Sequence, residues 1–380
     1  MQQFAFIVHP LDARRDVSRK YPIAKALPIS LIEWYIKQRS PLVVANVTGI
    51  RSPTGAEAQG WFIVCPLTPR QMLSLPLDFV YGKLEQCAHI AKDLGAGILG
   101  LGAFTSVVGD GGITLSKRVP GLAITTGNSY TVATAIEGTR RASELMGQTL
   151  SRSKVAIVGA NGSIGATCAE ILGREAAEVR LIGRDRDRLE TLAGKLRDKC
   201  AAQMTVSTDI PSSLKDADVI VTVTSAVDAV ILPEHIKRGA VVCDVARPRD
   251  VSVRVSKERN DVLVIEGGVV KVPGDVKMLK PESPGEDFYF GFPPQTAYAC
   301  MSETMMLALE GRYENFTLGK EVTVSQVDEI SAMAVKHGFH LAGFRSFEKA
   351  VTEDAIEDIR RNAGIATPAR ASATPGEVSM

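Results

Sequence analysis

The chain has 380 residues, of which 45% are hydrophobic and 23% charged, and its formal net charge is +1. This composition is typical of a globular protein with about two or three domains, and the near-zero charge gives no general attraction to nucleic acid or to an anionic membrane. No apolar run reaches the roughly 18 residues of a membrane-spanning helix, and the N-terminus lacks the features of a signal peptide. We therefore expect a cytoplasmic protein with no integral membrane segment and no nucleic-acid partner, and leave peripheral contact with a membrane open.

The cysteines stand singly along the chain, so neither a CxxC pair nor a Cys/His cluster indicates a metal site, and we expect none. A chain of this size needs no disulfide framework, which favours a reducing compartment. The six are Cys65, Cys87, Cys168, Cys200, Cys243 and Cys300.

The first third of the chain predicts an α/β unit. The strand-like run "FAFIVHP" (4–10) is followed by a basic segment, "DARRDVSRKYPIAK" (12–25). Between residues 61 and 120, apolar strand-like runs such as "WFIVCPL" alternate with the helical pattern "LDFVYGKLEQCAHIAKDLG". We expect residues 1–130 to form an N-terminal α/β domain that holds the substrate.

The middle of the chain predicts a doubly wound parallel sheet, the Rossmann-like architecture of dinucleotide-binding domains. "KVAIVGANGSIGATCAEILGREAAEVRLIGRD" (154–185) has the pattern of strand, glycine turn, helix and strand. The short aliphatic runs "ADVIVTVTSA", "GAVVCDVARP" and "VLVIEGGVV" are typical of further buried parallel strands. We expect this NADP-binding domain to span residues 131–275.

The glycines of "VGANGSIG" (158–165) have G-x-x-G-x-x-G spacing, close to the G-x-G-x-x-G pattern of dinucleotide-binding loops. Gly159 permits a tight turn, Gly162 lets the backbone approach a pyrophosphate, and Gly165 lets the next helix pack on the strand. An α/β turn without a ligand is the alternative, but the flanking strand and helix supply the context that the motif requires. The predicted cofactor-binding residues here are Gly159, Asn161, Gly162, Ser163, Ile164 and Gly165.

The end of the second strand distinguishes NAD from NADP. An acidic residue there usually accepts from the ribose 2′-hydroxyl, whereas this chain has Arg184 and, close by, Arg186. A guanidinium suits a 2′-phosphate, so we predict NADPH as the cofactor. Asp185 could serve a ribose hydroxyl instead, and a solvated helix start would explain the same charges. Thr224 and Ser225, at the end of the next strand, are predicted to border the cofactor.

The rest of the chain predicts helices and a tail. We expect residues 276–345 to form a C-terminal helical segment, in which helices at 296–311 and 322–338 pack back onto the body. Residues 346–380 are expected to be an extension, largely a disordered tail, because its end is rich in small residues and poor in bulky apolar ones.

Cys300 lies in this C-terminal segment. Thr296 is a candidate helix cap, which would put Cys300 in or just beyond the first turn, where the helix dipole favours a thiolate. A thiolate near a hydride donor can take an acyl group and present it for reduction. The alternative is that this cysteine only fills the core.

Several stretches together resemble the cyanobacterial-type long-chain acyl-[acyl-carrier-protein] reductases, which form fatty aldehydes. The longest is "AYACMSETMMLALEGRYENFTLGK" (297–320), followed by "KHGF", and ordinary nucleotide-binding sheets do not carry it. The resemblance covers most of residues 1–340 and implies a ping-pong mechanism. Cys300 takes the acyl chain as a thioester, NADPH delivers hydride, and the hemithioacetal collapses to the aldehyde. The other matching stretches are "HPLDARRDVSRKY", "LGAFTSVV", "TTGNSYTVA", "VGANGSIG" and "EGGVV".

The resemblance also implies partners and departures. The acyl donor would be acyl carrier protein or coenzyme A, and an aldehyde-consuming oxygenase would be a further partner. The basic segment 12–25 would dock an acidic carrier protein, although a solvated helix face explains it equally well. Tyr130 stands where the family has histidine, so we assign it to proton transfer. The chain beyond about residue 345 has no counterpart in the family.

Polar residues near strand ends are the remaining candidates. His9 follows the first strand and is a candidate proton donor, or a capped surface residue. Thr105, Ser106, Thr126 and Asn128 lie beside glycines, in loops that would form an oxyanion site for the substrate or merely turns held by their own side chains.

Two other functions stay open. An NADP-dependent dehydrogenase of a small alcohol or ketone, similar to the shikimate dehydrogenases, would use Cys300 only for packing. A nucleotide-sensing protein would keep the fold without catalysis. Neither would form an acyl-enzyme, which distinguishes both from the reductase.

Overall fold

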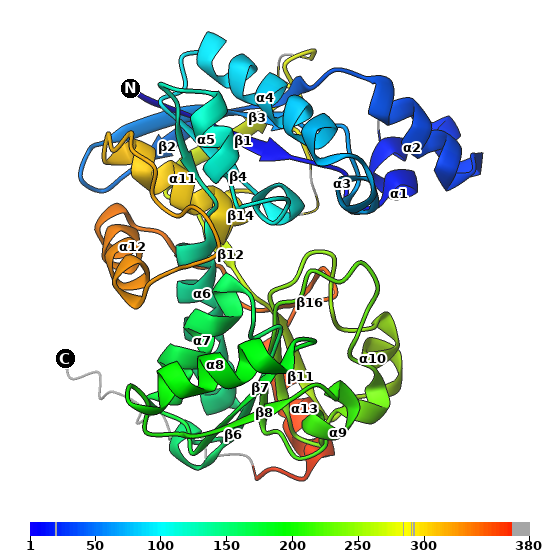
Figure 1. Cartoon of the computed structure of the whole chain (residues 1–380), viewed down its shortest axis with the longest axis vertical. Coiled ribbons are helices and arrows are strands. Elements are labelled where there is room, and N and C mark those ends of the chain that lie inside the picture. The colour runs from blue at the N-terminus through cyan, green and yellow to red at the C-terminus, as the bar shows by residue number, and fades with distance from the viewer. Residues whose placement is uncertain (20, 284, 290, 292, 367–380) are drawn as a thin grey trace, which may run out of the picture.

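The computed structural model describes residues 1–19, 21–283, 285–289, 291 and 293–366, and two six-stranded sheets dominate it. Figure 1 shows one sheet with its helices at the top and the other at the bottom, with helix α6 (Asn128–Leu145) running between them. Within the described residues, no helix combines the length and the apolar character needed to cross a membrane.

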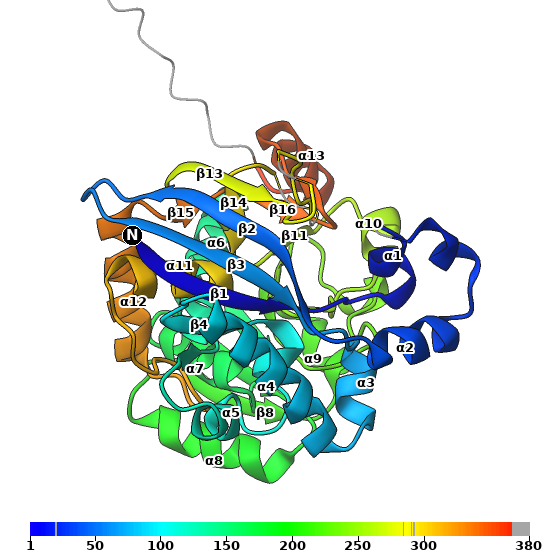
Figure 2. The ribbon, with the colours of Figure 1, turned by 90° about the horizontal axis from the view of Figure 1, so that it is seen from above.

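The first sheet has the strand order β13-β2-β3-β1-β4-β5. Strands β1, β3, β4 and β5 are parallel, and β2 and β13 add an antiparallel edge, which Figure 2 shows from above. Side chains alternate between faces, so Phe4 and Phe6 pack towards helix α11 (Ala299–Leu309), and Ala5 and Ile7 pack towards helix α4 (Leu77–Asp93). The bounds are β1 (Gln2–Val8), β2 (Leu42–Arg51), β3 (Glu57–Val64), β4 (Ile98–Leu101), β5 (Ala123–Thr125) and β13 (Gly274–Leu279).

The second sheet has the order β11-β10-β9-β6-β7-β8, and every neighbouring pair is parallel. Counted from β6, this is the 3-2-1-4-5-6 order of a doubly wound nucleotide-binding fold, so the predicted fold class is confirmed. Apolar side chains pack on both faces, as expected for a buried parallel sheet. The bounds are β6 (Lys154–Val158), β7 (Glu178–Ile182), β8 (Gln203–Ser207), β9 (Val219–Thr222), β10 (Val241–Asp244) and β11 (Leu263–Glu266).

Helices cover both sheets, and small strands join them. The longer helices are α2 (Ile29–Gln38), α4 (Leu77–Asp93), α7 (Ser163–Gly173), α8 (Arg186–Arg197), α11 (Ala299–Leu309), α12 (Val324–His337) and α13 (Glu353–Ala363). The shorter ones are α1 (Ala13–Ser18), α3 (Pro69–Ser74), α5 (Ile113–Arg118), α9 (Ile210–Leu214), α10 (Val253–Glu258) and the 3-10 helices η1 (Pro22–Ala26), η2 (Ala103–Ser106), η3 (Leu150–Arg152) and η4 (Pro233–His235). The small strands are β12 (Val269–Lys271), β14 (Thr296–Tyr298), β15 (His340–Leu341), β16 (Arg345–Ser346) and β17 (Lys349–Ala350).

The start of α11 differs from the prediction. Residues Thr296–Tyr298 form β14, paired antiparallel with β12, and the helix begins at Ala299 with Tyr298 as its cap residue. The Thr296 hydroxyl donates to the carbonyl of Pro293 at 2.6 Å, so Thr296 does not cap α11. Strand pairing outcompetes the local capping signal here, and it moves the helix start three residues closer to Cys300.

The extension after residue 345 also differs from the expected tail. Helix α13 is capped by the Thr352 hydroxyl and ends at Gly364 in the left-handed conformation. Ile356 packs into the core on one face of the second sheet. The expected tail therefore contains a capped amphipathic helix, although the small residues at its end suggested disorder for the whole segment. Residues 367–380 lie outside the described residues.

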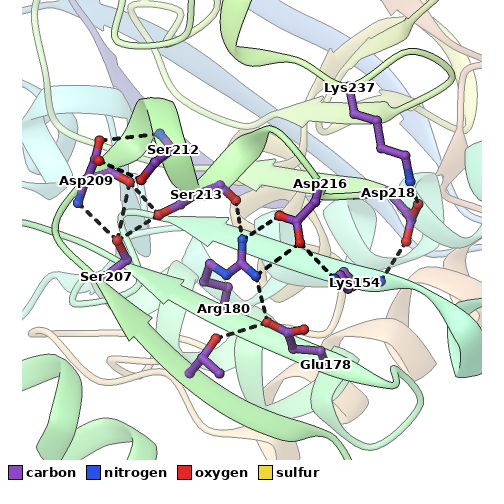
Figure 3. Close-up of polar contacts among 11 residues, drawn as sticks. Lys154, Glu178, Arg180, Ser207, Asp209, Ser212, Ser213, Asp216, Asp218 and Lys237 are labelled. Atoms are coloured by element: carbon purple, nitrogen blue, oxygen red, sulfur yellow. Dashed lines mark hydrogen bonds and ion pairs between the residues drawn. The ribbon is translucent and has the colours of Figure 1, made fainter.

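A charged network occupies the second sheet away from its glycine loop (Figure 3). Arg180, in β7, donates to Asp216 at 2.7 Å and to Glu178 at 2.9 Å, and Lys154 reaches the same Asp216 at 2.8 Å. These cations hold the pKa of Asp216 well below its usual range, with the Arg180 hydrogen bond as the main cause. Lys154 and Glu178 begin β6 and β7, so the network fixes the end of the sheet opposite the candidate site.

Candidate active site

The glycine loop has the geometry of a dinucleotide cradle. Gly159 has φ +88°, and a Cβ there would lie 2.6 Å from the Val223 carbonyl oxygen. A Cβ at Gly165 would lie 2.4 Å from the Gly159 carbonyl oxygen, so α7 packs closely only because that residue is glycine. Gly162 is exposed and directly precedes α7, leaving the first-turn amides of the helix open to an anion.

Asn161 shows that the loop fits a ligand. Its side-chain amide donates to the carbonyl of Asp185 at 3.0 Å, but its Oδ1 is buried with no hydrogen-bond partner. A buried acceptor without a donor is costly, and a ribose or phosphate hydroxyl next to the loop would satisfy it. Ser163 and Ile164 begin α7 and are both partly buried beside this position.

The arginines after β7 are exposed, as a phosphate clamp requires. Arg184 makes no ion pair with any described residue, and Arg186 has only a 3.5 Å contact with Glu190. The carboxylate of Asp185 is already engaged, since it caps α8 by accepting from the Arg188 amide at 3.1 Å. This engagement weakens the alternative in which Asp185 binds a ribose hydroxyl.

The loop after β9 is held by an aspartate that sequence reasoning missed. Asp250 is fully buried and accepts from the hydroxyl of Thr222 at 2.6 Å and from the hydroxyl and amide of Thr224 at 2.5 and 2.8 Å. Ser225 is exposed at the tip of the same loop. Asp250 therefore fixes Thr224 at the carboxyl end of β9. The surrounding sequence "VARPRDVS" does not indicate this role of Asp250, because its hydrogen bonds join residues that are far apart in the chain.

Cys300 lies beside the nucleotide loop. It is the second residue of α11 and is partly buried. A Cβ added at Gly127 would lie 2.3 Å from the Cβ of Cys300, so the two backbones are in close contact. The next residue, Asn128, donates from its side-chain amide to the Ser163 hydroxyl at 3.3 Å. Three predicted residues from distant segments thus come together: Cys300, Asn128 and Ser163.

The Cys300 thiol is protonated in the unliganded protein. Burial raises its pKa to about 12, the amide of Met301 opposes the rise, and the Glu303 carboxylate adds to it. The prediction of a thiolate stabilised by the helix dipole is therefore wrong for this state, because desolvation outweighs the first-turn amides.

Glu303, one turn after Cys300, is a second residue that sequence reasoning missed. It is fully buried, and among the described residues its hydrogen-bond donors are uncharged hydroxyls and one backbone amide. The carboxylate meets the first turn of α6 and thereby joins α6 to α11 beside Cys300. Its donors are the hydroxyls of Thr125, Thr317 (2.9 Å) and Ser129 (2.6 Å) and the amide of Tyr130 (3.0 Å).

The two predicted proton donors are constrained. Burial raises the pKa of the Tyr130 phenol, whose ring lies in the apolar core around α11. Burial lowers the pKa of His9 to about 4, so its imidazole is neutral at pH 7. The Phe104 amide donates to His9 Nε2 at 3.2 Å, which leaves the proton on Nδ1, 3.2 Å from the Pro10 carbonyl oxygen. Both ring nitrogens of His9 therefore have backbone partners, and Tyr130 keeps its phenol proton at pH 7.

The predicted oxyanion loops divide into two kinds. The hydroxyls of Thr105 and Ser106 donate to carbonyls of their own turn, Gly102 at 2.8 Å and Ala103 at 2.7 Å, as the simple turn interpretation expects. Thr126 instead donates to the hydroxyl of Thr317 at 3.0 Å and lies in the loop that contacts Cys300. Thr126 and Asn128 are thus near the cysteine, and the other pair is part of a local turn.

A cavity of about 1500 Å³ lies between α1, α2, the first sheet and the loops after β9 and β10. Tyr298 and Met301, on either side of Cys300, line it, as do His9 and several apolar residues, although Cys300 itself does not. Arg247 also lines it, with its guanidinium 5.5 Å from the Tyr298 ring and 3.5 Å from the Glu266 carboxylate. Arg15 and Arg19 bring the predicted basic segment to the same cavity.

Comparison with known proteins defines the class. Residues 140–266 match the family model of shikimate/quinate 5-dehydrogenases. With the strand order and the glycine loop, this match shows a Rossmann-type nucleotide-binding fold in that part of the chain.

Two relatives align along most of the chain. Aminotransferase PigE from a Serratia species is 30% identical over 367 residues, which cover 94% of this chain and 42% of that protein, so the chain spans less than half of that relative. A long-chain acyl-[acyl-carrier-protein] reductase from Synechococcus elongatus is 27% identical over 357 residues, which cover 88% of this chain and 98% of that protein.

Solved structures with similar segments include two nucleotide-dependent enzymes. The nucleotide-binding domain of glutamyl-tRNA reductase from Thermoplasma volcanium is 21% identical with a TM-score of 0.27, over 35% of this chain and 84% of that one. NAD-dependent malic enzyme from Thermotoga maritima is 13% identical with a TM-score of 0.40, over 95% of this chain and 84% of that one.

Proposed function

We propose that this chain is an NADPH-dependent reductase of long-chain acyl thioesters that forms fatty aldehydes through an acyl-enzyme on Cys300. The observation that carries the proposal is the contact of Cys300 with Gly127, whose neighbour Asn128 bonds Ser163 of the nucleotide loop. The relative from Synechococcus, which the alignment spans almost completely and which is a long-chain acyl-[acyl-carrier-protein] reductase, supports the same chemistry.

A protonated resting thiol is compatible with this route. The Cys300 sulfur attacks the thioester carbonyl, the bond to the donor sulfur breaks, and the thiol proton of Cys300 passes to the leaving donor thiol. The transfer consumes no base overall. The high pKa of the Cys300 thiol therefore slows the acyl transfer but does not prevent it. Bound NADPH would supply the hydride to the acyl carbon; the carbon–sulfur bond of the resulting hemithioacetal on Cys300 then breaks, the aldehyde leaves, and the sulfur takes a proton from water.

The donor and the partners follow the same proposal. Acyl carrier protein or coenzyme A would bring the acyl group, with the basic segment 12–25 at the cavity as the docking site for an acidic carrier protein. An aldehyde-consuming oxygenase would take the product, and the protein would work in the cytoplasm. The apolar side chains of the cavity would hold the acyl chain.

Mass spectrometry tests the proposal. Acyl-carrier-protein and acyl-coenzyme A thioesters of several chain lengths are incubated with the protein, with and without NADPH. We expect intact-mass addition of one acyl group on Cys300 without NADPH, and aldehyde with loss of the adduct when NADPH is added. Aldehyde formation that never passes through an adduct would contradict the covalent route.

Cofactor choice gives a separate prediction. Arg184→Ala should raise the KM for NADPH about tenfold or more and leave the KM for NADH unchanged, because one charge-assisted contact to the 2′-phosphate is lost. Arg197→Ala, an exposed arginine at the other end of α8, is the matched control. Steady-state kinetics with both cofactors measure the effect, and an equal change for NADH would mean that Arg184 does not select the phosphate.

A small-molecule dehydrogenase is the second candidate. The match of residues 140–266 to the shikimate/quinate 5-dehydrogenase model favours it, and the raised pKa of Cys300 fits a packing role. In that case no acyl adduct forms, and a serine at position 300 keeps the activity.

A further inference from the structure

The hairpin β16–β17 ends in an unfavourable turn. Its two tip residues, Phe347 and Glu348, have φ +48° and +68°. Two-residue hairpin turns of this kind favour Asn-Gly, because side chains with a Cβ are strained at positive φ. Such strain persists only where the surroundings impose it, so contacts at the tip must hold Glu348 in place.

Those contacts come from both halves of the molecule. The Glu348 carboxylate accepts from Arg15 of α1 at 3.2 Å and from Arg249, in the loop after β10, at 2.9 Å. Its amide donates to Glu266, at the end of β11, at 2.8 Å, and its carbonyl accepts from Arg345. One carboxylate oxygen thus accepts from two guanidinium groups of opposite halves, while the Nε of Arg15 donates to Asp16 and the Nε of Arg249 donates to Glu266, each at 3.2 Å.

The place of this contact is the wall of the large cavity. Arg15, Arg249 and Glu348 all line it, together with Tyr298 and Met301 beside Cys300. The loops after β9 and β10 lie on the opposite side of β6 from Arg184, which follows β7. Arg249, in the loop after β10, therefore lies away from the predicted 2′-phosphate position, and Arg15 reaches the same Glu348 from α1.

We propose that Arg15 and Arg249 form a binding site for the phosphate of the pantetheine arm of an acyl donor, and that Glu348 occupies this site until the donor binds. The proposal rests on the proposed function, because acyl carrier protein and coenzyme A both present the acyl thioester on a phosphopantetheine arm. A phosphate offers guanidinium forks the same charge as a carboxylate with more acceptor oxygens. The Glu348 side chain is 54% exposed, so it is able to leave.

Titration of the full chain tests the site without turnover. The probes are 4′-phosphopantetheine and pantetheine, which differ only in the phosphate, and calorimetry measures both affinities in the absence of NADPH. Glu348→Gln removes the charge of the side chain. Glu348→Gly also removes the charge, and because glycine adopts positive φ without strain, the turn of the hairpin stays favourable. The matched control is Glu258→Gln, an exposed acid that pairs with Arg254 elsewhere.

We expect both Glu348 variants to bind 4′-phosphopantetheine about three- to tenfold more tightly, and to bind pantetheine with unchanged affinity. Each variant removes a carboxylate that competes with the phosphate, and the phosphate no longer has to break a partly exposed ion pair with each arginine. Arg249→Gln should weaken phosphopantetheine binding about tenfold. The proposal is overturned if Glu348→Gly leaves phosphopantetheine affinity unchanged or weaker, or if the wild-type protein binds both probes equally.

The result separates this site from the Cys300 chemistry. Tighter phosphopantetheine binding without any aldehyde would leave the anion site standing and remove the reductase. Aldehyde formation with unchanged affinity in Glu348→Gly would keep the reductase and remove the anion site.

Discussion

Cys300→Ser should reduce aldehyde formation from acyl thioesters by about three orders of magnitude or more, because the serine hydroxyl is a far weaker nucleophile and forms no thioester for hydride reduction. NADPH affinity should stay unchanged, since replacing the sulfur by oxygen keeps the Gly127 contact and the Asn128–Ser163 hydrogen bond in place. Aldehyde production by chromatography and NADPH binding by fluorescence measure the two effects independently.

Cys200→Ser is the matched control. Cys200 is also partly buried, but it lies after α8 and donates to the Glu170 carbonyl of α7 at 3.4 Å. Its variant should keep full activity and still form the acyl adduct. Normal aldehyde production by Cys300→Ser would mean that the cysteine only fills space, and the dehydrogenase candidate would then be preferred.

Glu303→Ala should lower the free energy of unfolding by about 3–5 kcal/mol. The alanine leaves the hydroxyl of Ser129 and the amide of Tyr130 buried without the acceptor that they have now, beside a cavity of side-chain size. Urea denaturation followed by circular dichroism measures the change. Glu303→Gln keeps the shape and one acceptor oxygen, so its loss should be smaller.

Glu258→Ala gives the comparison for an exposed carboxylate. That residue pairs with Arg254 at 2.8 Å within α10 in a solvated position, so its removal should leave the free energy of unfolding nearly unchanged. If Glu303→Ala is as mild as this control, the carboxylate is not holding α6 to α11. Aldehyde formation by folded Glu303→Gln protein measures separately how much the activity of Cys300 depends on the contact between α6 and α11.

The sequence by itself determined the second sheet and its glycine loop. Short aliphatic runs such as "VAIVG" are typical of strands that are buried on both faces. The local sequence pattern therefore predicted the same parallel strands that the sheet contains. Gly159 and Gly165 were assigned correctly to close backbone contacts because only glycine fits those distances. The helix expected at 322–338 is α12, which begins at Val324, and its capping box of Thr323 and Gln326 is a purely local feature of the chain.

Only the tertiary structure decided the chemistry around Cys300. The pairing of β14 with β12 displaced the expected Thr296 cap, and burial overrode the helix dipole in setting the pKa of the thiol. Glu303 and Glu348 gained their roles from partners far away in the chain, Thr125 and Arg15. The physical reason is the same for each: desolvation and convergent hydrogen bonds depend on which distant segments meet, and sequence spacing carries no record of that meeting.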